Sequence, residues 1–162
     1  MRARLATDDD AEAFAAVVRA VAEEGRWIGT EGPLDIAAFS ERVRSSLAGG
    51  DALWVLEDDA GHVVGTLGLH RSKARGVVSL GMCIVAPARG QGGGHALLDA
   101  AMAWLADSDM HKVDLEVWPD NAPAITLYTQ YGFEVEGVRR DHYRRRDGSL
   151  RSVLIMAQRL RP

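Results

Sequence analysis

The sequence predicts a single α/β domain, with a mixed central sheet of about seven strands and helices on both faces. Short segments with strand-like alternation of apolar residues are interleaved with longer segments of helical periodicity. No repeat, low-complexity tract or proline-rich linker divides residues 1–162, so all of them are assigned to one domain. The predicted element order is β-α-α-β-β-β-α-β-α-β-β.

The first strand, Arg2–Ala6, leads into a helix for which Thr7 suits the N-cap position. Asp8–Asp10 place negative charge in the first helical turn, where the helix dipole favours it. The glycine-containing segment Gly25–Pro33 ends this helix, and a second helix finishes at Gly49–Gly50.

Turn residues organise the rest of the chain. Residues 58–61 predict a tight hairpin, and Asp147–Gly148 predicts a second one near the end of the chain. Asn121 can cap a helix that Gly132 stops. The remaining strands are predicted at Ala52–Glu57, Val63–Leu69, Val77–Val85, Lys112–Val117, Phe133–Val138 and Ser152–Ala157, and the remaining helices at Gln91–Ala106 and Asn121–Tyr131.

Composition argues against several classes of protein. The formal net charge of −4 disfavours a nucleic-acid partner, because phosphate binding needs a basic surface. The single cysteine, Cys83, excludes an intrachain disulfide and favours a reducing compartment. There is no signal-peptide-like start and no apolar run of about 18 residues, so we expect a cytoplasmic protein without a membrane partner. The five histidines lack metal-ligand spacing, and no metal is expected.

The most informative segment is the glycine-rich turn, residues 85–95 (VAPARGQGGGH), between a predicted strand and a predicted helix. Its four glycines allow a ligand to approach the backbone closely and allow positive φ angles. The unpaired N–H groups of the following helical turn favour an anion, and Arg89 adds a charged donor. A phosphate or pyrophosphate suits this cradle, and a purely structural tight loop is the alternative.

Two common phosphate-binding motifs do not fit the glycine-rich turn. A Walker A loop ends in Gly-Lys-Ser/Thr, and His95 stands where the lysine is needed. A G-x-G-x-x-G dinucleotide fingerprint that starts at Gly90 also fails at His95. Moreover, the turn comes after predicted antiparallel hairpins, whereas the dinucleotide fingerprint follows the first strand of a βαβ unit.

Residues 85–94 carry the pattern V-x-x-x-R-x-x-G-x-G, which resembles the acetyl-CoA motif of the GNAT superfamily of N-acetyltransferases. Residues 121–128 (NAPAITLY) and 131–133 (YGF) resemble the second motif of that family, at the usual separation. The resemblance covers essentially the whole chain. It implies a GNAT-like fold in which two central strands splay apart, and an N-acetyltransferase with acetyl-CoA as the acyl donor.

The resemblance also implies which residues bind the acyl donor. Backbone groups at the end of the predicted strand Val77–Val85 would pair with the pantetheine arm of acetyl-CoA. Backbone amides of the glycine-rich turn would hold its pyrophosphate. Asn121 would contact the donor near its thioester end. The implied donor-binding residues are Cys83, Ile84, Val85, Arg89, Gly90, Gln91, Gly92, Gly93, Gly94 and Asn121.

Acetyl transfer needs a neutral amine, donors for the thioester oxygen and a proton for the leaving thiolate. Glu116 is the candidate base, because it lies near the C-terminal end of a predicted central strand, where α/β sheets bind ligands. It also resembles the base position of ribosomal-protein N-terminal acetyltransferases, and a solvated edge carboxylate is the alternative. Tyr128, two helical turns after Asn121, is the candidate acid, and a core aromatic residue is the alternative.

Other residues are weaker candidates for a functional role. Cys83 is expected to be a small buried apolar residue, not a nucleophile. Trp27 and Glu31 lie in the break between the first two helices, which overhangs the acceptor in the resembling family. They are candidate substrate-binding residues, as is Tyr143, although Trp27 could simply pack. The arginine-rich segment 139–151 is interpreted as a solvated, salt-bridged edge that discourages strand pairing, or alternatively as a surface that captures a carboxylate or an acidic partner.

The leading hypothesis is direct transfer of acetyl from acetyl-CoA to a primary amine in a ternary complex. Family branches that acetylate free amino acids, protein N-termini or phosphinothricin share these motifs, so the small-molecule or peptide acceptor stays open. A catalytically silent acyl-CoA-binding sensor or partner module is the alternative, and the presence of Glu116 and Tyr128 counts against it. Acetylation of aminoacyl-tRNA would need a broad basic surface, which the net charge disfavours. A homodimer is common in the resembling family, whereas the sequence itself does not indicate an oligomeric state.

Overall fold

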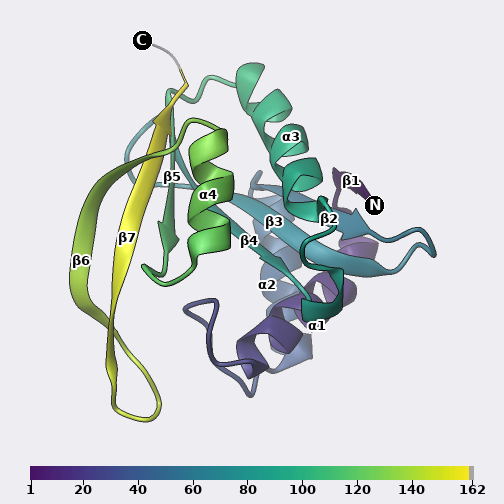
Figure 1. Cartoon of the computed structure of the whole chain (residues 1–162). Helices are drawn as coiled ribbons and strands as arrows, with labels where there is room; N and C mark the ends of the chain where they lie inside the picture. The colour runs from purple at the N-terminus through teal and green to yellow at the C-terminus, as the bar shows by residue number, and fades with distance from the viewer. Residues whose placement is uncertain (161–162) are drawn as a thin grey trace.

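One mixed sheet of seven strands, ordered β1-β2-β3-β4-β5-β7-β6, runs through the computed structural model, which describes residues 1–160 (Figure 1). The element order is the one that the sequence predicts. The strands are β1 (Arg2–Leu5), β2 (Ala52–Glu57), β3 (Val63–Arg71), β4 (Val77–Ile84), β5 (Lys112–Val117), β6 (Glu134–Arg144) and β7 (Leu150–Arg159). The helices are α1 (Ala11–Glu23), α2 (Ile36–Ala48), α3 (Gly93–Ala106) and α4 (Ala122–Gln130), with short 3-10 turns η1 (Asp8–Asp10) and η2 (Ala86–Ala88).

Helices cover both faces of the sheet, as predicted (Figure 1). The alternation along β2 explains the two layers, since successive side chains point to opposite faces. Leu53 and Val55 pack with α1 and α2 on one face, whereas Trp54 and Leu56 pack with α3 on the other. β2 is therefore buried on both faces and anchors two separate apolar clusters.

The sheet opens between β4 and β5, the one parallel pair among strands that otherwise pair antiparallel. Their register runs only as far as Leu80 opposite Leu115. Beyond that point, residues 81–84 pair with β3 alone, and residues 116–117 pair with β7 alone. Just below the opening, Ser79 Oγ donates to Asp114 Oδ1 at 2.5 Å and ties the two strands together. The splayed central strands that the resemblance implied are therefore present.

Several boundaries differ from the prediction by one or more residues, and two of these differences have a clear physical cause. α3 begins at Gly93 instead of Gln91, because Gly92 has a φ of +83° and cannot continue a right-handed helix backwards. The closing hairpin is longer than predicted, since β6 and β7 pair out to Arg144 opposite Leu150. The second half of β6 is mostly charged, so it lacks the alternation of apolar residues on which the strand prediction was based.

The start of α1 is organised by a buried carboxylate. Asp10 Oδ2 accepts hydrogen bonds from the Thr7 backbone N–H and the Thr7 hydroxyl, which fits the cap predicted at Thr7. Arg4 donates to both Asp10 oxygens at 2.7 and 2.8 Å. This guanidinium lowers the pKa of Asp10 from 3.8 to about 2. Within residues 1–160, no helix has the length and apolar character needed to cross a bilayer.

Candidate active site

The glycine-rich turn connects the end of β4 to α3 and presents unpaired backbone donors. Within the described chain, no atom accepts a hydrogen bond from the backbone N–H groups of residues 90–95. The first bonded amide of this region is that of Ala96, which donates to the Gly92 carbonyl at 3.1 Å. Six consecutive amides at a helix N-terminus form a site that favours an anion.

The four glycines of the turn serve two different purposes. Gly90 and Gly92 have φ angles of +73° and +83°, a backbone conformation that L side chains rarely adopt. Gly93 and Gly94 instead allow close packing. A Cβ atom at Gly93 would lie 2.5 Å from Leu56 Cδ2, and one at Gly94 would lie 2.7 Å from Leu127 Cδ2. The glycines therefore shape the turn and seat the first turn of α3 against β2 and α4.

Arg89 braces the turn and is not free to reach a ligand. Its Nε donates to the Ile84 carbonyl at 2.7 Å, and its two Nη atoms donate to Glu24 at 2.8 and 2.5 Å. The guanidinium lowers the pKa of Glu24. Arg89 thus links the end of α1 to the end of β4, which differs from the direct phosphate donor expected from the sequence.

The strand edge next to the opening is only partly available. The Val85 N–H donates to Val64 O at 3.0 Å, and the Val85 carbonyl accepts from Ala88 N at 3.0 Å, because the chain turns into η2 there. Residues 81–84, including Cys83 and Ile84, lie beside the opening with no strand on the β5 side. Of the three residues expected to pair with the donor, Val85 is therefore the least suited.

The side chains of Cys83 and Asn121, two residues implied in donor binding, each have a partner within the chain. The Cys83 thiol lies 3.4 Å from Thr66 Oγ1, and burial raises its pKa to about 11. Such a thiol stays protonated at neutral pH and is a poor nucleophile. On α4, Asn121 Oδ1 accepts from Ala124 N at 3.4 Å, so its side chain caps the helix as predicted.

Tyr128 is both the predicted acid and a core aromatic residue. It is 6% exposed, and its ring lies 5.7 Å from that of Phe133. Burial, followed by the nearby Cys83, raises the pKa of the phenol above its ordinary value. Among residues 1–160, no group is hydrogen-bonded to its hydroxyl, which leaves this neutral donor free for a ligand.

The carboxylate of Glu116 lies past the point where β5 leaves β4. Tyr143 Oη donates to Glu116 Oε2 at 2.5 Å, and Arg139 Nη1 donates to Glu116 Oε1. Burial and the bond to Glu116 raise the pKa of Tyr143 to about 12, so the phenol stays protonated. The Glu116 side chain keeps 29% of its surface exposed. Two candidate residues that the sequence suggested separately are thus in direct contact.

Sequence reasoning missed Trp118, which immediately follows β5 on the same face as Glu116. It is 3% exposed and meets the Tyr143 ring edge-on, with 5.1 Å between ring centroids. Arg151 and Arg145 lie over its ring, with Cζ at 4.4 and 5.6 Å from the centroid. Its Nε1 is buried and has no hydrogen-bond partner among residues 1–160. Residues two apart in a strand share a face, and the spacing of Glu116 and Trp118 is the signal that could have found this residue.

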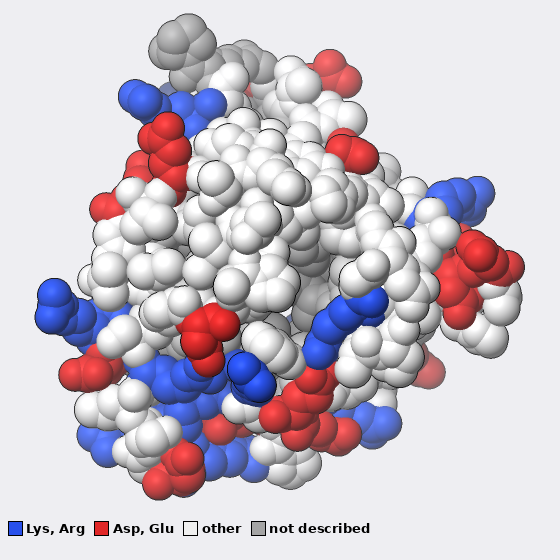
Figure 2. Space-filling view, in the orientation of Figure 1, with Lys and Arg blue, Asp and Glu red and all other residues white. Residues whose placement is uncertain are grey.

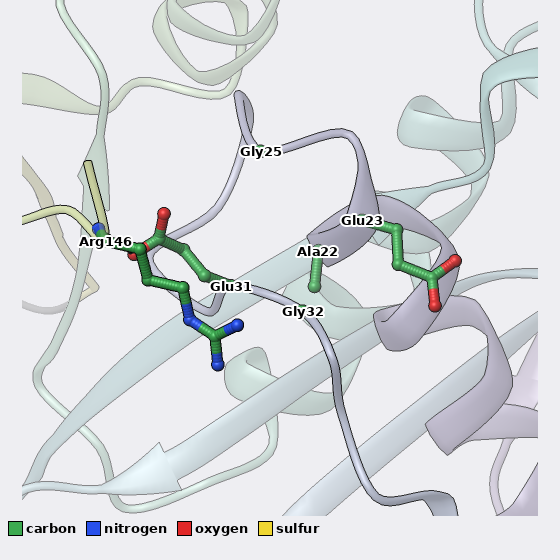
Figure 3. Close-up of a pocket in the computed structure, with 6 residues that line it drawn as sticks. All are labelled: Ala22, Glu23, Gly25, Glu31, Gly32 and Arg146. Carbon is green, nitrogen blue, oxygen red and sulfur yellow. Dashed lines mark hydrogen bonds between the residues drawn. The ribbon is translucent and has the colours of Figure 1, made fainter.

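The segment between α1 and α2 is packed against other parts of the chain. Trp27 lies beneath two arginines, with Arg26 Cζ at 4.4 Å and Arg89 Cζ at 5.7 Å from its ring centroid. Glu31 accepts from the Arg146 backbone N–H at 3.1 Å and pairs with Arg145. Glu31 and Arg146 both line a hollow of about 210 Å³. Figure 3 shows these two side chains next to each other. None of the predicted catalytic residues lines that hollow; its lining is Ala22, Glu23, Gly25, Glu31, Gly32 and Arg146.

The arginine-rich segment is a solvated edge only in part. Basic side chains gather over the β6–β7 hairpin with acidic ones among them (Figure 2). Arg140, Arg144 and Arg146 are exposed. Arg145 is only 6% exposed, however, because its guanidinium contacts backbone carbonyls and Glu31. The interpretation of the whole segment as a solvated edge is therefore wrong for Arg145.

Comparison with known proteins agrees with this architecture. The chain is 33% identical to the L-amino acid N-acetyltransferase AaaT of Escherichia coli over 103 residues, which are 60% of this chain and 62% of that protein. It is 32% identical to the mycothiol acetyltransferase of Saccharomonospora viridis over 127 residues, 74% of this chain and 42% of that protein. The chain thus spans less than two thirds of the length of these curated relatives.

Solved structures share the fold at lower identity. A ribosomal-protein-alanine N-acetyltransferase from Brucella melitensis superposes with a TM-score of 0.89 at 23% identity, covering 98% of this chain and 99% of that one. A phosphinothricin acetyltransferase from Sinorhizobium meliloti, crystallised with acetyl-CoA, gives 0.86 at 20% identity, covering 97% and 86%. Residues 9–133 also match the family model described as the acetyltransferase (GNAT) family. The family resemblance of the two motifs is therefore confirmed, and the chain belongs to the GNAT family of acetyltransferases.

Proposed function

We propose that the protein transfers the acetyl group of acetyl-CoA to a primary amine by direct attack in a complex that holds both substrates. The observation that carries the proposal is the set of unpaired amides at residues 90–95 beside the opening between β4 and β5. Tyr128 and Glu116 supply the two proton-transfer groups that the reaction needs.

The chain offers a consistent set of contacts for the acyl donor. The amides of residues 90–95 suit a pyrophosphate, because they supply fixed donors at the positive end of a helix dipole. Residues 81–84 can pair with the amide groups of a pantetheine arm as an added strand, through groups other than the Ile84 carbonyl, which already accepts from Arg89. When bound, acetyl-CoA supplies an acetyl group that is activated as a thioester. Arg89 contributes indirectly, by holding the turn in place through Glu24.

Tyr128 is proposed as the general acid. As the amine nitrogen forms the new C–N bond and the C–S bond breaks, the departing thiolate needs a proton. Burial keeps the Tyr128 phenol protonated, and its hydroxyl has no competing partner among residues 1–160. A neutral phenol of this kind donates a proton to a thiolate over a short distance.

Glu116 is proposed to receive the amine and to accept its proton. Its two oxygens already accept from Tyr143 and Arg139, so an incoming ammonium group must compete with these donors. Arg139 is the more exposed of the ion pair, with 52% of its side-chain surface accessible, and is the partner that an acceptor can displace. The released proton then passes to solvent, because Glu116 is itself partly exposed.

The proposed acceptor is an α-amino group, of a free amino acid or a peptide N-terminus. The E. coli relative is named for L-amino acids and the Brucella structure for a ribosomal-protein alanine, and both names describe α-amino acceptors. A free amino acid has a further match here. It could exchange the Glu116–Arg139 ion pair for two of its own, with its ammonium on Glu116 and its carboxylate on Arg139.

The test is an acetyl-CoA turnover screen that measures released thiol with amino acids, N-terminal peptides, polyamines and aminoglycosides as acceptors. We expect turnover with α-amino acceptors and a loss of turnover when their amino group is blocked. Binding of acetyl-CoA without thiol release for any amine would favour the catalytically silent module instead.

A further inference from the structure

The segment between α1 and α2 contains a stretch that lacks backbone hydrogen bonds of its own. Within residues 1–160, no backbone–backbone hydrogen bond involves residues 26–34. Residues 25–31, which we call the acceptor-side loop, contain two glycines and adopt no helix or strand. Such a loop has little to fix its conformation, unless side chains from elsewhere satisfy its polar groups.

Arg145, from the β6–β7 hairpin, makes most of these contacts. Its Nη1 donates to the carbonyls of Gly29 and Ile28 at 3.0 and 3.3 Å. Its Nη2 donates to the carbonyl of Gly25 at 3.3 Å, and its Nε pairs with Glu31 at 3.3 Å. A guanidinium that is only 6% exposed is costly to bury, unless its donors are satisfied as they are here.

Arg151, on β7, makes a further hydrogen bond to the acceptor-side loop. Its Nη1 donates to the Arg26 carbonyl at 2.9 Å, and its Nη2 donates to Asp120 Oδ1 at 2.9 Å. Both arginines lie over the buried Trp118 ring, which fixes their planes relative to the end of β5. Arg145 and Arg151 together are called the arginine clamp below.

The acceptor-side loop is in direct contact with the proposed acceptor site. A Cβ atom at Gly29 would lie 2.9 Å from Cε1 of Tyr143, so the loop backbone rests against that ring. Tyr143 in turn donates to Glu116 and packs edge-on against Trp118. Movement of the loop would therefore release the Tyr143 ring and with it one of the two hydrogen-bond partners of Glu116.

The geometry points to the arginine clamp as a positioning device for the acceptor: Arg145 and Arg151 hold the acceptor-side loop against Tyr143, so that the loop forms one wall of the acceptor site. This inference rests on the proposed function. Among residues 1–160, Arg145 and Arg151 make no contact with the glycine-rich turn, and the loop meets the turn through the Trp27 ring beneath Arg89. Because Arg89 is also held by Glu24 and the Ile84 carbonyl, loss of the clamp should affect the acceptor far more than acetyl-CoA.

Two measurements on the intact chain test the clamp. The first is limited trypsin digestion, with cleavage after Arg26 followed by mass spectrometry, because Arg26 is exposed and its carbonyl is held by Arg151. The second is steady-state kinetics with the KM values for acceptor and for acetyl-CoA measured separately. The variants are Arg145→Ala, Arg145→Lys and Arg151→Gln, and Arg144→Ala is the matched control, because Arg144 is the exposed neighbour of Arg145.

For Arg145→Ala we expect cleavage after Arg26 to accelerate about tenfold or more, and the acceptor KM to rise by a similar factor, with the acetyl-CoA KM unchanged within about twofold. Arg145→Lys should show smaller increases in the cleavage rate and in the acceptor KM than Arg145→Ala, because lysine keeps the charge and can still donate to the carbonyls. Arg144→Ala should behave as the unaltered protein. If Arg145→Ala does not fold, Arg145→Lys and Arg151→Gln decide the question.

Three results would overturn the inference. Unchanged cleavage in the clamp variants would mean that the arginines do not hold the loop. Faster cleavage with an unchanged acceptor KM would mean that the loop is not a wall of the acceptor site. Equal rises in both KM values would indicate general destabilisation. If the unaltered protein turns over no amine at all, the proposed function fails first, and the inference that rests on it falls with it, whatever the digestion shows about the loop.

Discussion

Replacing Tyr128 with phenylalanine removes one oxygen atom from a buried residue of α4 that lies near Cys83 of β4. The hydroxyl has no hydrogen-bond partner among residues 1–160, so its removal leaves no protein group unsatisfied. We therefore expect the melting temperature of Tyr128→Phe to stay close to that of the unaltered protein. The packing against Phe133 is retained, because the ring itself is unchanged.

Turnover should respond differently. A positioned general acid accelerates a reaction by about 10²–10⁴-fold, so we expect kcat to fall by about 10²-fold or more, equivalent to about 3 kcal/mol of transition-state stabilisation. The dissociation constant for acetyl-CoA should be nearly unchanged. Because burial raises the pKa of Tyr128, the kcat of the unaltered protein should show no loss from ionisation of this phenol near neutral pH.

The matched control is Tyr131→Phe, which removes the hydroxyl group from the tyrosine that follows α4. The single hydroxyl proton of Tyr131 is shared between Asp99 Oδ1 at 2.6 Å and the His95 carbonyl at 3.1 Å, so loss of the hydroxyl should lower stability by about 1 kcal/mol while kcat is retained. Thermal unfolding and steady-state kinetics on both variants give the comparison. Unchanged kcat in Tyr128→Phe would refute the assignment of this residue as the acid.

Four further predictions address the turn, the proton acceptor, the cysteine and the fold. Gly92→Ala forces a side chain into a φ of +83° and should cost about 1–2 kcal/mol of stability and weaken acetyl-CoA binding; Gly137→Ala, which has open space and no positive φ, is its control in unfolding and calorimetry. Glu116→Gln should lower activity most at low pH, where the amine is mostly protonated; a pH–rate profile of unchanged shape would mean that water accepts the proton. Cys83→Ala should retain turnover, because the protonated thiol takes no part in direct transfer; loss of activity in a folded variant would favour an acyl-cysteine route. The folded-state pKa of Asp10 is lowered to about 2, so this residue contributes about 2 kcal/mol of stability above pH 4, which is lost as the pH falls towards 2; acid unfolding curves should show this loss in the unaltered protein and not in Asp10→Asn.

The sequence was sufficient for the framework of the fold because its cues are local. β5 (Lys112–Val117) follows the alternation of six consecutive residues, and α4 begins and ends at a capping asparagine and a stopping glycine. The same kind of cue failed in β6, where charged residues occupy a long edge strand that little else covers. Local patterns report burial, and an exposed hairpin offers little of it.

The site was predicted less completely because its contacts are tertiary. Arg89 looked like a phosphate donor, until the fold brought Glu24, 65 residues earlier, into contact with it. Arg145 belongs to a basic run in the sequence, but it is buried because loop carbonyls more than 100 residues away need donors. Trp118 is two residues after Glu116, as the period of a strand requires for a shared face, yet only the structure shows that Tyr143 and two arginines meet on its ring.

The central claim is that bare amides of the glycine-rich turn hold the diphosphate of acetyl-CoA. Titration of a ¹⁵N-labelled protein with acetyl-CoA tests it directly, because glycine amides give well-separated signals. We expect the amide signals of Gly90, Gly92, Gly93 and Gly94 to shift strongly and in step with binding, as their N–H groups gain an anionic acceptor. Binding that leaves these four signals in place, or no binding at all, would contradict the claim.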